Sequence, residues 1–599
     1  MNLKEFTESV DQSVEKLSKE ELCCFIHSIA RKVPDKERSE FLQILDEIGA
    51  VYNLCPDQKS LKAVKKLVDE KEVQVEFNRL TELFSQIEEE ELYLQAEYYE
   101  DYSQGDWSDD GDWEYEDPNG ICQIYEQGYQ FLLRCVIDGF YMEASDMFDL
   151  LLDTEVMVEN DGDSFTMGLE ELTGNGLVSI NLTNLALHTL YAVYQTCPKE
   201  ERARRLYVYF EVHFFENIRI EDMLSLGREE LGELPEFWDS WIELLCNAAG
   251  DKEARLLKEA VNFQRGEDKM LDVARIAYEK HPSLYLEVLM GLERLHDYER
   301  QLLVGKEALE KIDKKYILRS EIALKTAESS IWMGEEDYAE DCWMLALESS
   351  TTPVNFLRIM AESGEPQRYR DAAVKIIRFA KHGGNARNGF LKELEENCVS
   401  ERERDILWFL CGNFNESMEK CRAEKQALGW SGRFIKCGIA LFLLLLFKED
   451  NLKQGCMQMA DKVIMEMDFK ASVYYSGTKF YNEYRNDELT GSKKRDVFWK
   501  CFCRWKKGYC LSEEQMEKYL EYLEQMIDKR VKGIVSGQFR AHYEEVAALA
   551  AALGEVKESI GDANAKQTVL NQFRSAFPRH SSFHAALRKY GMTDMRSNR

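Results

Sequence analysis

Proline is scarce in this chain, with nine among 599 residues. Collagen-like and proline-rich disordered proteins are therefore excluded. Hydrophobic residues make up 45% of the sequence and charged residues 31%, a balance that suits long amphipathic helices around a buried core. We expect a chain that is folded almost throughout and at least two thirds helical.

A membrane-spanning run is also missing. The most apolar stretch, Cys437 to Phe447, ends at Lys448, well short of the roughly 20 residues that cross a bilayer, and predicts a buried helix. Met1 to Glu21 is polar and charged and has no apolar segment of the signal-peptide type. We therefore expect a cytoplasmic protein with no membrane contact, whose 16 cysteines are mostly reduced and buried.

Positive charge is in deficit, because 76 Lys and Arg stand against 110 Asp and Glu, a formal net charge of −34. Such a field repels nucleic-acid phosphates and favours a protein or peptide partner with a basic surface. A basic C-terminal tail is the exception, and is either a route to nucleic acid or a solvated helix end. Its cationic residues are Lys566, Arg574, Arg579, Arg588, Lys589, Arg596 and Arg599.

Signatures of catalysis are missing as well. The sequence has no Walker phosphate loop, no dinucleotide glycine fingerprint, no His-Glu-x-x-His and no Gly-x-Ser-x-Gly. Carboxylates are too numerous for the sequence to single out any one pair as a catalytic acid and base. We expect neither enzymatic activity nor a cofactor, although a site assembled only by folding remains an alternative.

What the chain does have is a recurring helical-hairpin pattern. Gly139, Tyr141, Ala144 and Phe148 form the clearest copy. The glycine permits a tight turn, the alanine lets two helices approach, and the aromatics fill the groove between neighbouring units. A second copy contains Gly334, Ala339, Trp343 and Ala346, and a third, less regular one contains Tyr298 and Ala308.

These observations predict an all-α fold, a TPR-like repeat solenoid with a small N-terminal bundle, because runs of alternating polarity are too few for a sheet. The N-terminal bundle covers residues 1–83, and an acidic, aromatic helix and connecting loop covers 84–120. The TPR-like repeats cover 121–430. A C-terminal helical region covers 431–599.

The acidic loop from Asp106 to Asp117 matches the twelve-residue pattern of a calcium-binding loop. It has a glycine at position six and an apolar residue at position eight. However, the last position is Asp117 where a bidentate Glu is usual, and Pro118 follows. A solvated acidic loop explains the pattern as well, so calcium binding would be weak. The candidate ligands are Asp106, Ser108, Asp110, Glu114 and Asp117.

The C-terminal region resembles the closing segment of bacterial SWIM zinc-finger proteins. The similarity lies in the run from Arg530 to Gly537, followed by Arg540 and Tyr543, and in the run from Phe577 to Phe583. The resemblance implies a helical, repeat-like extension in a bacterial cell and brings no catalytic residue with it.

The zinc motif of that family is incomplete here. Cys501, Cys503 and Cys510 reproduce the first three ligands of Cys-x-Cys and Cys-x-His, but Ser512 stands where the histidine belongs. Structural zinc sites need four ligands, so we expect no zinc.

Together these features predict a non-catalytic scaffold that binds a basic protein, chiefly through the hairpins of residues 121–430. The alternative is a metal-dependent regulatory or enzymatic component that uses the calcium-like loop or a zinc site.

Overall fold

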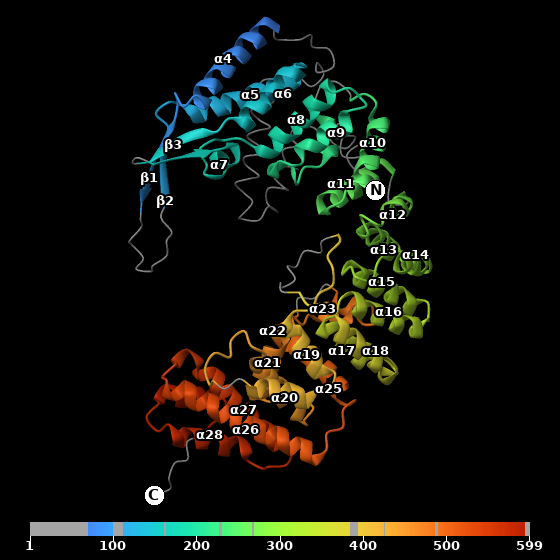
Figure 1. Cartoon of the computed structure of the whole chain (residues 1–599), viewed down its shortest axis with the longest axis vertical. Coiled ribbons are helices and arrows are strands. Elements are labelled where there is room, and N and C mark those ends of the chain that lie inside the picture. The colour runs from blue at the N-terminus through green and yellow to red at the C-terminus, as the bar shows by residue number, and fades with distance from the viewer. Residues whose placement is uncertain are drawn as a thin grey trace, which may run out of the picture. The chain divides into compact units, whose positions relative to one another are not determined.

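The computed structural model describes most of the chain from residue 70 onward. The described residues are 70–99, 112–160, 163–226, 231–265, 269–383, 393–423, 426–485 and 489–593. Helices make up 70% of them, in 26 α-helices and some 3-10 turns, which confirms the predicted helical content for this part of the chain (Figure 1). Residues 1–69, most of the predicted N-terminal bundle, lie outside the described residues.

The chain divides into two compact units, residues 1–273 and 274–599. The first unit contains the clearest predicted hairpin. Helix α5 (Ile121–Asp138) ends at Gly139, which adopts a left-handed φ of 85°, and α6 (Tyr141–Asp153) begins two residues later. Ala144 and Phe148 are fully buried, and the ring of Tyr141 lies 5.8 Å from that of Tyr191 in the next long helix. Each residue of the motif therefore has the predicted role.

The other helices of this unit are α4 (Glu70–Glu88), α7 (Leu169–Gly174), α8 (Leu182–Thr196), α9 (Arg202–Tyr209), α10 (Leu234–Asn247), α11 (Asp251–Arg265) and α12 (Met270–Ala277), the last of which crosses the unit boundary. Of these, α4 and α8 pack on that hairpin, and α9, α10 and α11 follow in a chain of successive contacts from α8. Residues 202–215, whose aromatic pattern fits a strand or a helix, are α9 followed by a 3-10 turn.

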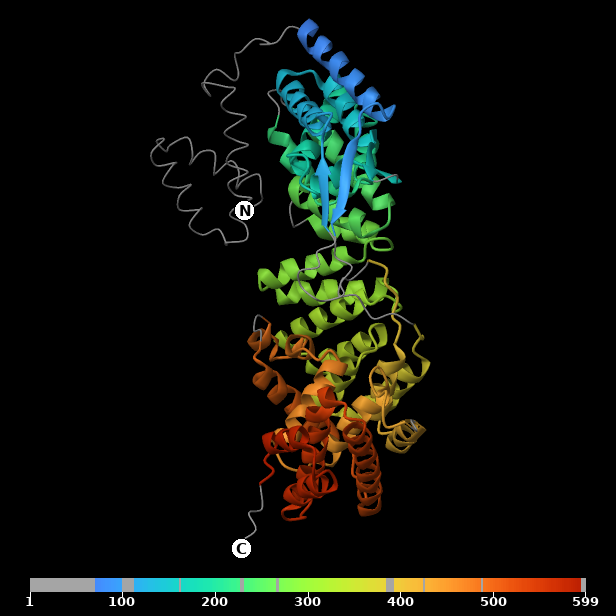
Figure 2. The ribbon, with the colours of Figure 1, turned by 90° about the vertical axis from the view of Figure 1, so that its left-hand side faces the viewer.

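The described fold is mostly helical, as predicted, but a four-stranded sheet in the first unit shows that it is not all-α. Its strands are β1 (Leu94–Tyr99), β2 (Asp112–Glu116), β3 (Val156–Asn160) and β4 (Asp163–Met167), in the order β2-β1-β3-β4. The blue arrows in Figure 2 belong to this sheet. The β1–β2 and β3–β4 pairs are antiparallel, and β1 and β3 are parallel. Residues 84–120 therefore begin with the end of α4, as expected of a helix, and then contain two strands where a loop was expected.

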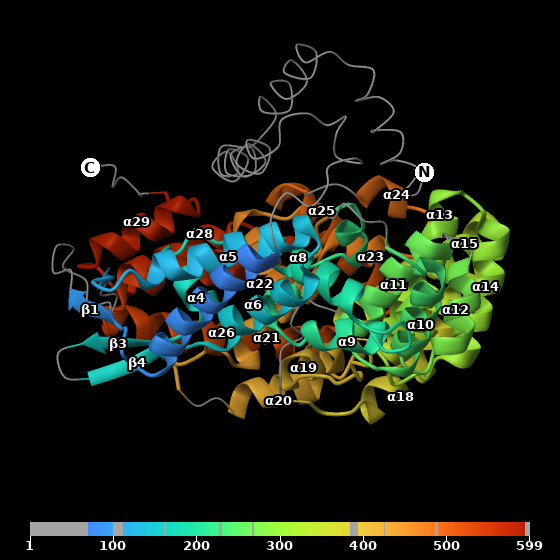
Figure 3. The same ribbon diagram turned by 90° about the horizontal axis from the view of Figure 1, so that it is seen from above.

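The second unit opens with three consecutive helical hairpins. Their helices are α13 (Ser283–Arg294), α14 (Tyr298–Lys311), α15 (Leu318–Trp332), α16 (Glu336–Ser349), α17 (Pro353–Glu362) and α18 (Pro366–Phe379). Successive helices from α13 to α18 pack side by side, with α13, α14 and α15 at the right of Figure 3. Gly334 takes a φ of 78° between α15 and α16, as the repeat pattern predicts.

Residues 471–485 pack against these hairpins from a distant part of the chain. This stretch contains α23 (Ala471–Tyr475) and α24 (Tyr481–Tyr484). The fully buried Arg358 on α17 donates hydrogen bonds to the carbonyls of Val473 and Tyr474, and Trp343 on α16 donates to Gly477 O at 2.7 Å. The hairpins are thus partly covered by the chain itself.

The remaining helices form the C-terminal part of this unit. They are α19 (Glu401–Leu410), α20 (Phe414–Ala423), α21 (Phe434–Leu446), α22 (Gln454–Glu466), α25 (Gly491–Lys506), α26 (Glu513–Ser536), α27 (Tyr543–Ser559), α28 (Ala565–Ala576) and α29 (Ser581–Lys589). Helix α21 is the predicted apolar helix, and nearly all its side chains are buried. None of the helices in the described ranges combines the length and apolarity that crossing a bilayer requires.

Candidate interaction surface on the acidic sheet

The two faces of the sheet differ sharply in polarity. Leu94, Ala96, Val156 and Val158 are buried and lie on one face. Side chains alternate along a strand, so the intervening residues lie on the opposite face. That opposite face contains four exposed glutamates, which we call the acidic face: Glu97, Glu114, Glu116 and Glu159.

Strand register brings these carboxylates together in two rows. Glu97 on β1 lies directly opposite Glu114 on β2. Gln95 lies between Glu116 on β2 and Glu159 on β3 in the second row. Like charges directly opposite one another destabilise a sheet, so the arrangement has an energetic cost.

Neutralising side chains are missing from the sheet itself, since its four strands contain no Lys or Arg. Within the described ranges, Glu114, Glu116 and Glu159 form no ion pair. The acidic face therefore presents a concentrated negative charge to its surroundings, in addition to the overall charge of −34.

Two aromatic rings are exposed at the sheet edges. Trp113 on β2 is 41% exposed and Phe165 on β4 is 37% exposed. Their ring centroids are 5.6 Å apart in an edge-to-face arrangement. Tyr115, also on β2, is half-buried, and its pKa is raised by burial and by the negative charge of Glu171. By the strand register, Trp113, Tyr115 and Phe165 lie on the face that contains Ala96 and Val158, opposite the glutamates.

The predicted calcium ligands divide between this sheet and the next helix. Glu114 lies on β2, whereas Asp117 accepts hydrogen bonds from the backbone N–H groups of Ile121 and Cys122 at 2.8 and 2.9 Å, and so caps α5. Asp106, Ser108 and Asp110 lie outside the described residues. The described half of the motif is β2 and the residue that follows it, between β1 and α5, where a loop was expected.

The three cysteines of the incomplete zinc motif do not converge. Cys501 and Cys503 are two positions apart on α25, a spacing that points side chains to different sides of a helix. Cys501 is buried and Cys510 is exposed, and burial raises the pKa of the Cys501 thiol. Throughout the described part of the chain, no group of three or more His, Cys, Asp or Glu side chains is arranged to hold a metal ion.

Ser512, which replaces the zinc-binding histidine, caps a helix. Its hydroxyl accepts a hydrogen bond from the backbone N–H of Gln515 at 3.1 Å, and the Gln515 side chain accepts one from the Ser512 N–H at 3.0 Å. This is a capping box at the start of α26. The residue therefore has a structural role at this position.

The acidic face was missed by the sequence reasoning. A partial signal was present, since the apolar residues at 94 and 96 alternate with polar ones. That strand is only six residues long, and in β3 the residue between Val156 and Val158 is the apolar Met157. Comparison with protein-family models and with curated proteins finds no match for the chain. The functional argument therefore depends on the surface itself.

Proposed function

We propose that the protein is a non-catalytic helical-repeat scaffold of the bacterial cytoplasm that binds a basic protein partner. The observation that supports this proposal is the acidic face, where four glutamates lie on one exposed surface without a Lys or Arg in the same strands. The bacterial setting follows only from the resemblance to SWIM-associated proteins.

Electrostatics explains why a basic partner fits best. Lysine or arginine side chains placed over the rows would relieve the repulsion between Glu97 and Glu114. The negative field would also attract such a partner from a distance, which raises the rate of association at low salt.

Hairpin helices support the rest of the proposal. Repeated hairpins expose more surface than a compact domain of the same size and leave several faces for partners. The sequence predicts the main binding surface within residues 121–430. Residues 471–485 cover part of the hairpins in the second unit. We therefore assign the first contact with the partner to the sheet, to which Glu159, within residues 121–430, contributes.

The test combines Glu114→Gln, Glu116→Gln and Glu159→Gln in one variant. A matched control changes three exposed glutamates of the second unit, Glu299→Gln, Glu310→Gln and Glu336→Gln, so that the net charge changes equally. Binding is measured by anisotropy with a labelled Lys- and Arg-rich peptide and by capture of partners from the host at low salt.

We expect the sheet variant to bind the peptide about tenfold more weakly than the control variant. This difference in affinity should shrink as the salt concentration rises. Equal binding by the two variants would show that the acidic face is not the docking surface. Turnover of a small substrate by the purified protein would contradict the non-catalytic assignment.

A further inference from the structure

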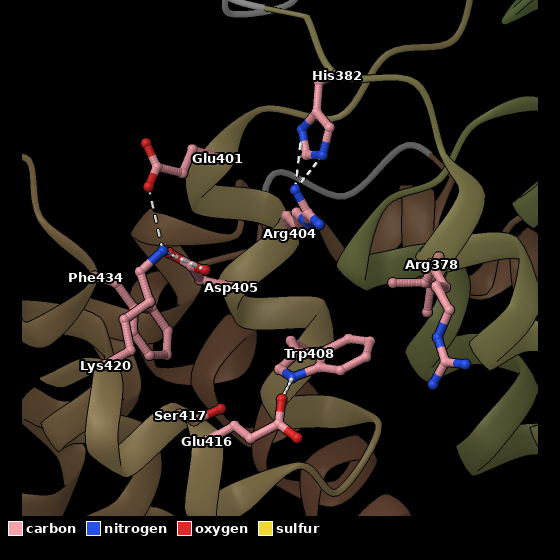
Figure 4. A pocket seen from close by; sticks show the side chains of 11 residues that line it. Arg378, His382, Glu401, Arg404, Asp405, Trp408, Glu416, Ser417, Lys420 and Phe434 are labelled. Atoms are coloured by element: carbon pink, nitrogen blue, oxygen red, sulfur yellow. Dashed lines mark hydrogen bonds and ion pairs between the residues drawn. The ribbon is translucent and has the colours of Figure 1, made fainter.

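A pocket of about 620 Å³ lies in the second unit, far in sequence from the acidic sheet (Figure 4). Its walls come from the end of α18, the segment at His382, helices α19 and α20, and the first residue of α21. Arg404, Asp405 and Trp408 follow one another at helical spacing on α19, so this helix turns a single side toward the pocket.

The carboxylates of the pocket already have donors. Lys420 contacts Glu401 at 3.2 Å and Asp405 at 2.6 Å, and the indole N–H of Trp408 donates to Glu416 at 2.7 Å. Burial lowers the pKa of Lys420, but its hydrogen bonds to Asp405 and Glu401 outweigh that effect and raise it. Lys420 therefore stays positively charged and is paired with the carboxylates of Glu401 and Asp405.

The two arginines lack such partners. Within the described ranges, neither Arg378 nor Arg404 pairs with a carboxylate. The guanidinium of Arg404 contacts the imidazole of His382, and that of Arg378 lies 5.9 Å from the ring centre of Trp408. Figure 4 shows Arg404 and His382 together, with Arg378 across the indole from the Lys420 cluster.

Two buried apolar side chains also line the pocket, among mostly polar ones. Ile377 and Phe434 are 3% and 7% exposed, and both line the cavity. Ser417 lies beside them, and its buried hydroxyl has no hydrogen-bond partner among the described residues. A buried hydroxyl without a partner is costly, so it marks a place where a ligand oxygen would be stabilised.

We propose that this pocket binds a small organic anion, a carboxylate attached to a flat apolar body. The carboxylate would bind the guanidinium groups of Arg378 and Arg404, which suit planar oxyanions. The flat body would lie along the indole of Trp408 and over Ile377 and Phe434, as in most small-molecule sites. The pocket is independent of the proposed partner surface, because its two arginines without a carboxylate partner offer a place for an anion.

The experiment uses 4-fluorobenzoate as probe and follows its fluorine NMR line width during titration of the full-length protein. Arg378→Gln and Arg404→Gln remove the unpaired cations one at a time, and Trp408→Leu removes the flat contact. Arg422→Gln is the matched control, because Arg422 lies on the same helix as Lys420 but pairs with Glu419 outside the pocket.

We expect each of the three pocket variants to weaken binding at least about tenfold, the loss typical of a charged hydrogen bond, while Arg422→Gln binds like the wild type. Circular dichroism melting of every variant separates lost binding from lost folding. Unchanged binding in both arginine variants would overturn the anion site. Inorganic phosphate that binds as tightly as 4-fluorobenzoate would overturn the apolar part of the assignment.

Discussion

Trp343 connects two distant parts of the second unit. Its side chain is buried on α16, and its indole N–H donates to Gly477 O. The repeat pattern predicts Trp343 as a packing residue, and its contact with residue 477 adds a hydrogen bond that spacing alone does not indicate.

Trp343→Ala should lower the free energy of unfolding by roughly 3 to 5 kcal/mol, because it opens a large cavity and leaves the carbonyl of Gly477 without its donor. Trp343→Phe keeps most of the ring and should cost less, roughly 1 to 3 kcal/mol. Urea unfolding followed by circular dichroism measures both. If both variants lost the same small amount of free energy of unfolding, the site would have to collapse around the missing side chain.

Glu328 on α15 is a buried carboxylate in a crowded ionic cluster. Its nearest cation, Lys325, lies 3.6 Å away and also contacts Glu293 at 2.5 Å. Burial raises the pKa of Glu328 to about 7, with Lys325 opposing and Glu293 reinforcing the shift. Between the ordinary glutamate pKa and about 7, the folded chain therefore holds a proton that the unfolded chain releases.

Stability from this group is present at low pH and is lost as the pH rises from about 4.5 through 7. Glu328→Gln should remove that loss, and raise the free energy of unfolding at pH 8 by roughly 1 to 3 kcal/mol while changing little at pH 5. Urea midpoints at the two pH values measure the effect, with the exposed Glu310→Gln as control. A destabilised variant at pH 8 would mean that the ion pair with Lys325 outweighs burial.

At the scale of elements, three helices meet around one buried carboxylate. Glu555 on α27 is fully buried and accepts hydrogen bonds from the backbone N–H groups of Gly455 and Cys456, at the start of α22. Lys566 on α28 contacts the same carboxylate at 2.7 Å. The carboxylate thus satisfies two free N–H groups of a helix end and gains from the helix dipole.

This junction requires a glycine. A Cβ atom on Gly455 would lie 2.4 Å from the backbone nitrogen of Ala552 on α27. Gly455→Ala should therefore force α22 and α27 apart and cost roughly 1 to 3 kcal/mol. Gly491→Ala is the control, since a Cβ there meets nothing within 4 Å. Thermal unfolding compares the two, and equal melting temperatures would contradict the close approach.

Local sequence signals explain which elements could be predicted. Hairpins such as α5 and α6 were found because a glycine with positive φ separates two apolar helical stripes. The sheet could not be predicted in this way, because its strands are short and contain glutamate, a residue that strands usually disfavour. The acidic face depends on strand register, and the anion pocket on packing between α18, α19 and α20, neither of which a local pattern encodes.

At the scale of the whole molecule, metal content provides a further test. Purified protein should contain no zinc, because Ser512 caps α26 and the cysteines at 501 and 503 face different sides of α25. Elemental analysis measures this directly. One zinc per chain, lost in Cys503→Ala, would show that another part of the chain completes the site.

The contact between residues 471–485 and the hairpins has a consequence for synthesis on the ribosome. Arg358 is fully buried, and burial lowers its pKa to about 10, so its guanidinium depends on the carbonyls of residues 473 and 474 for stabilisation. Those carbonyls leave the ribosome more than a hundred residues after α17 does. We therefore expect the hairpins of the second unit to stay incompletely packed during synthesis until residues 471–485, which complete their core, have been translated.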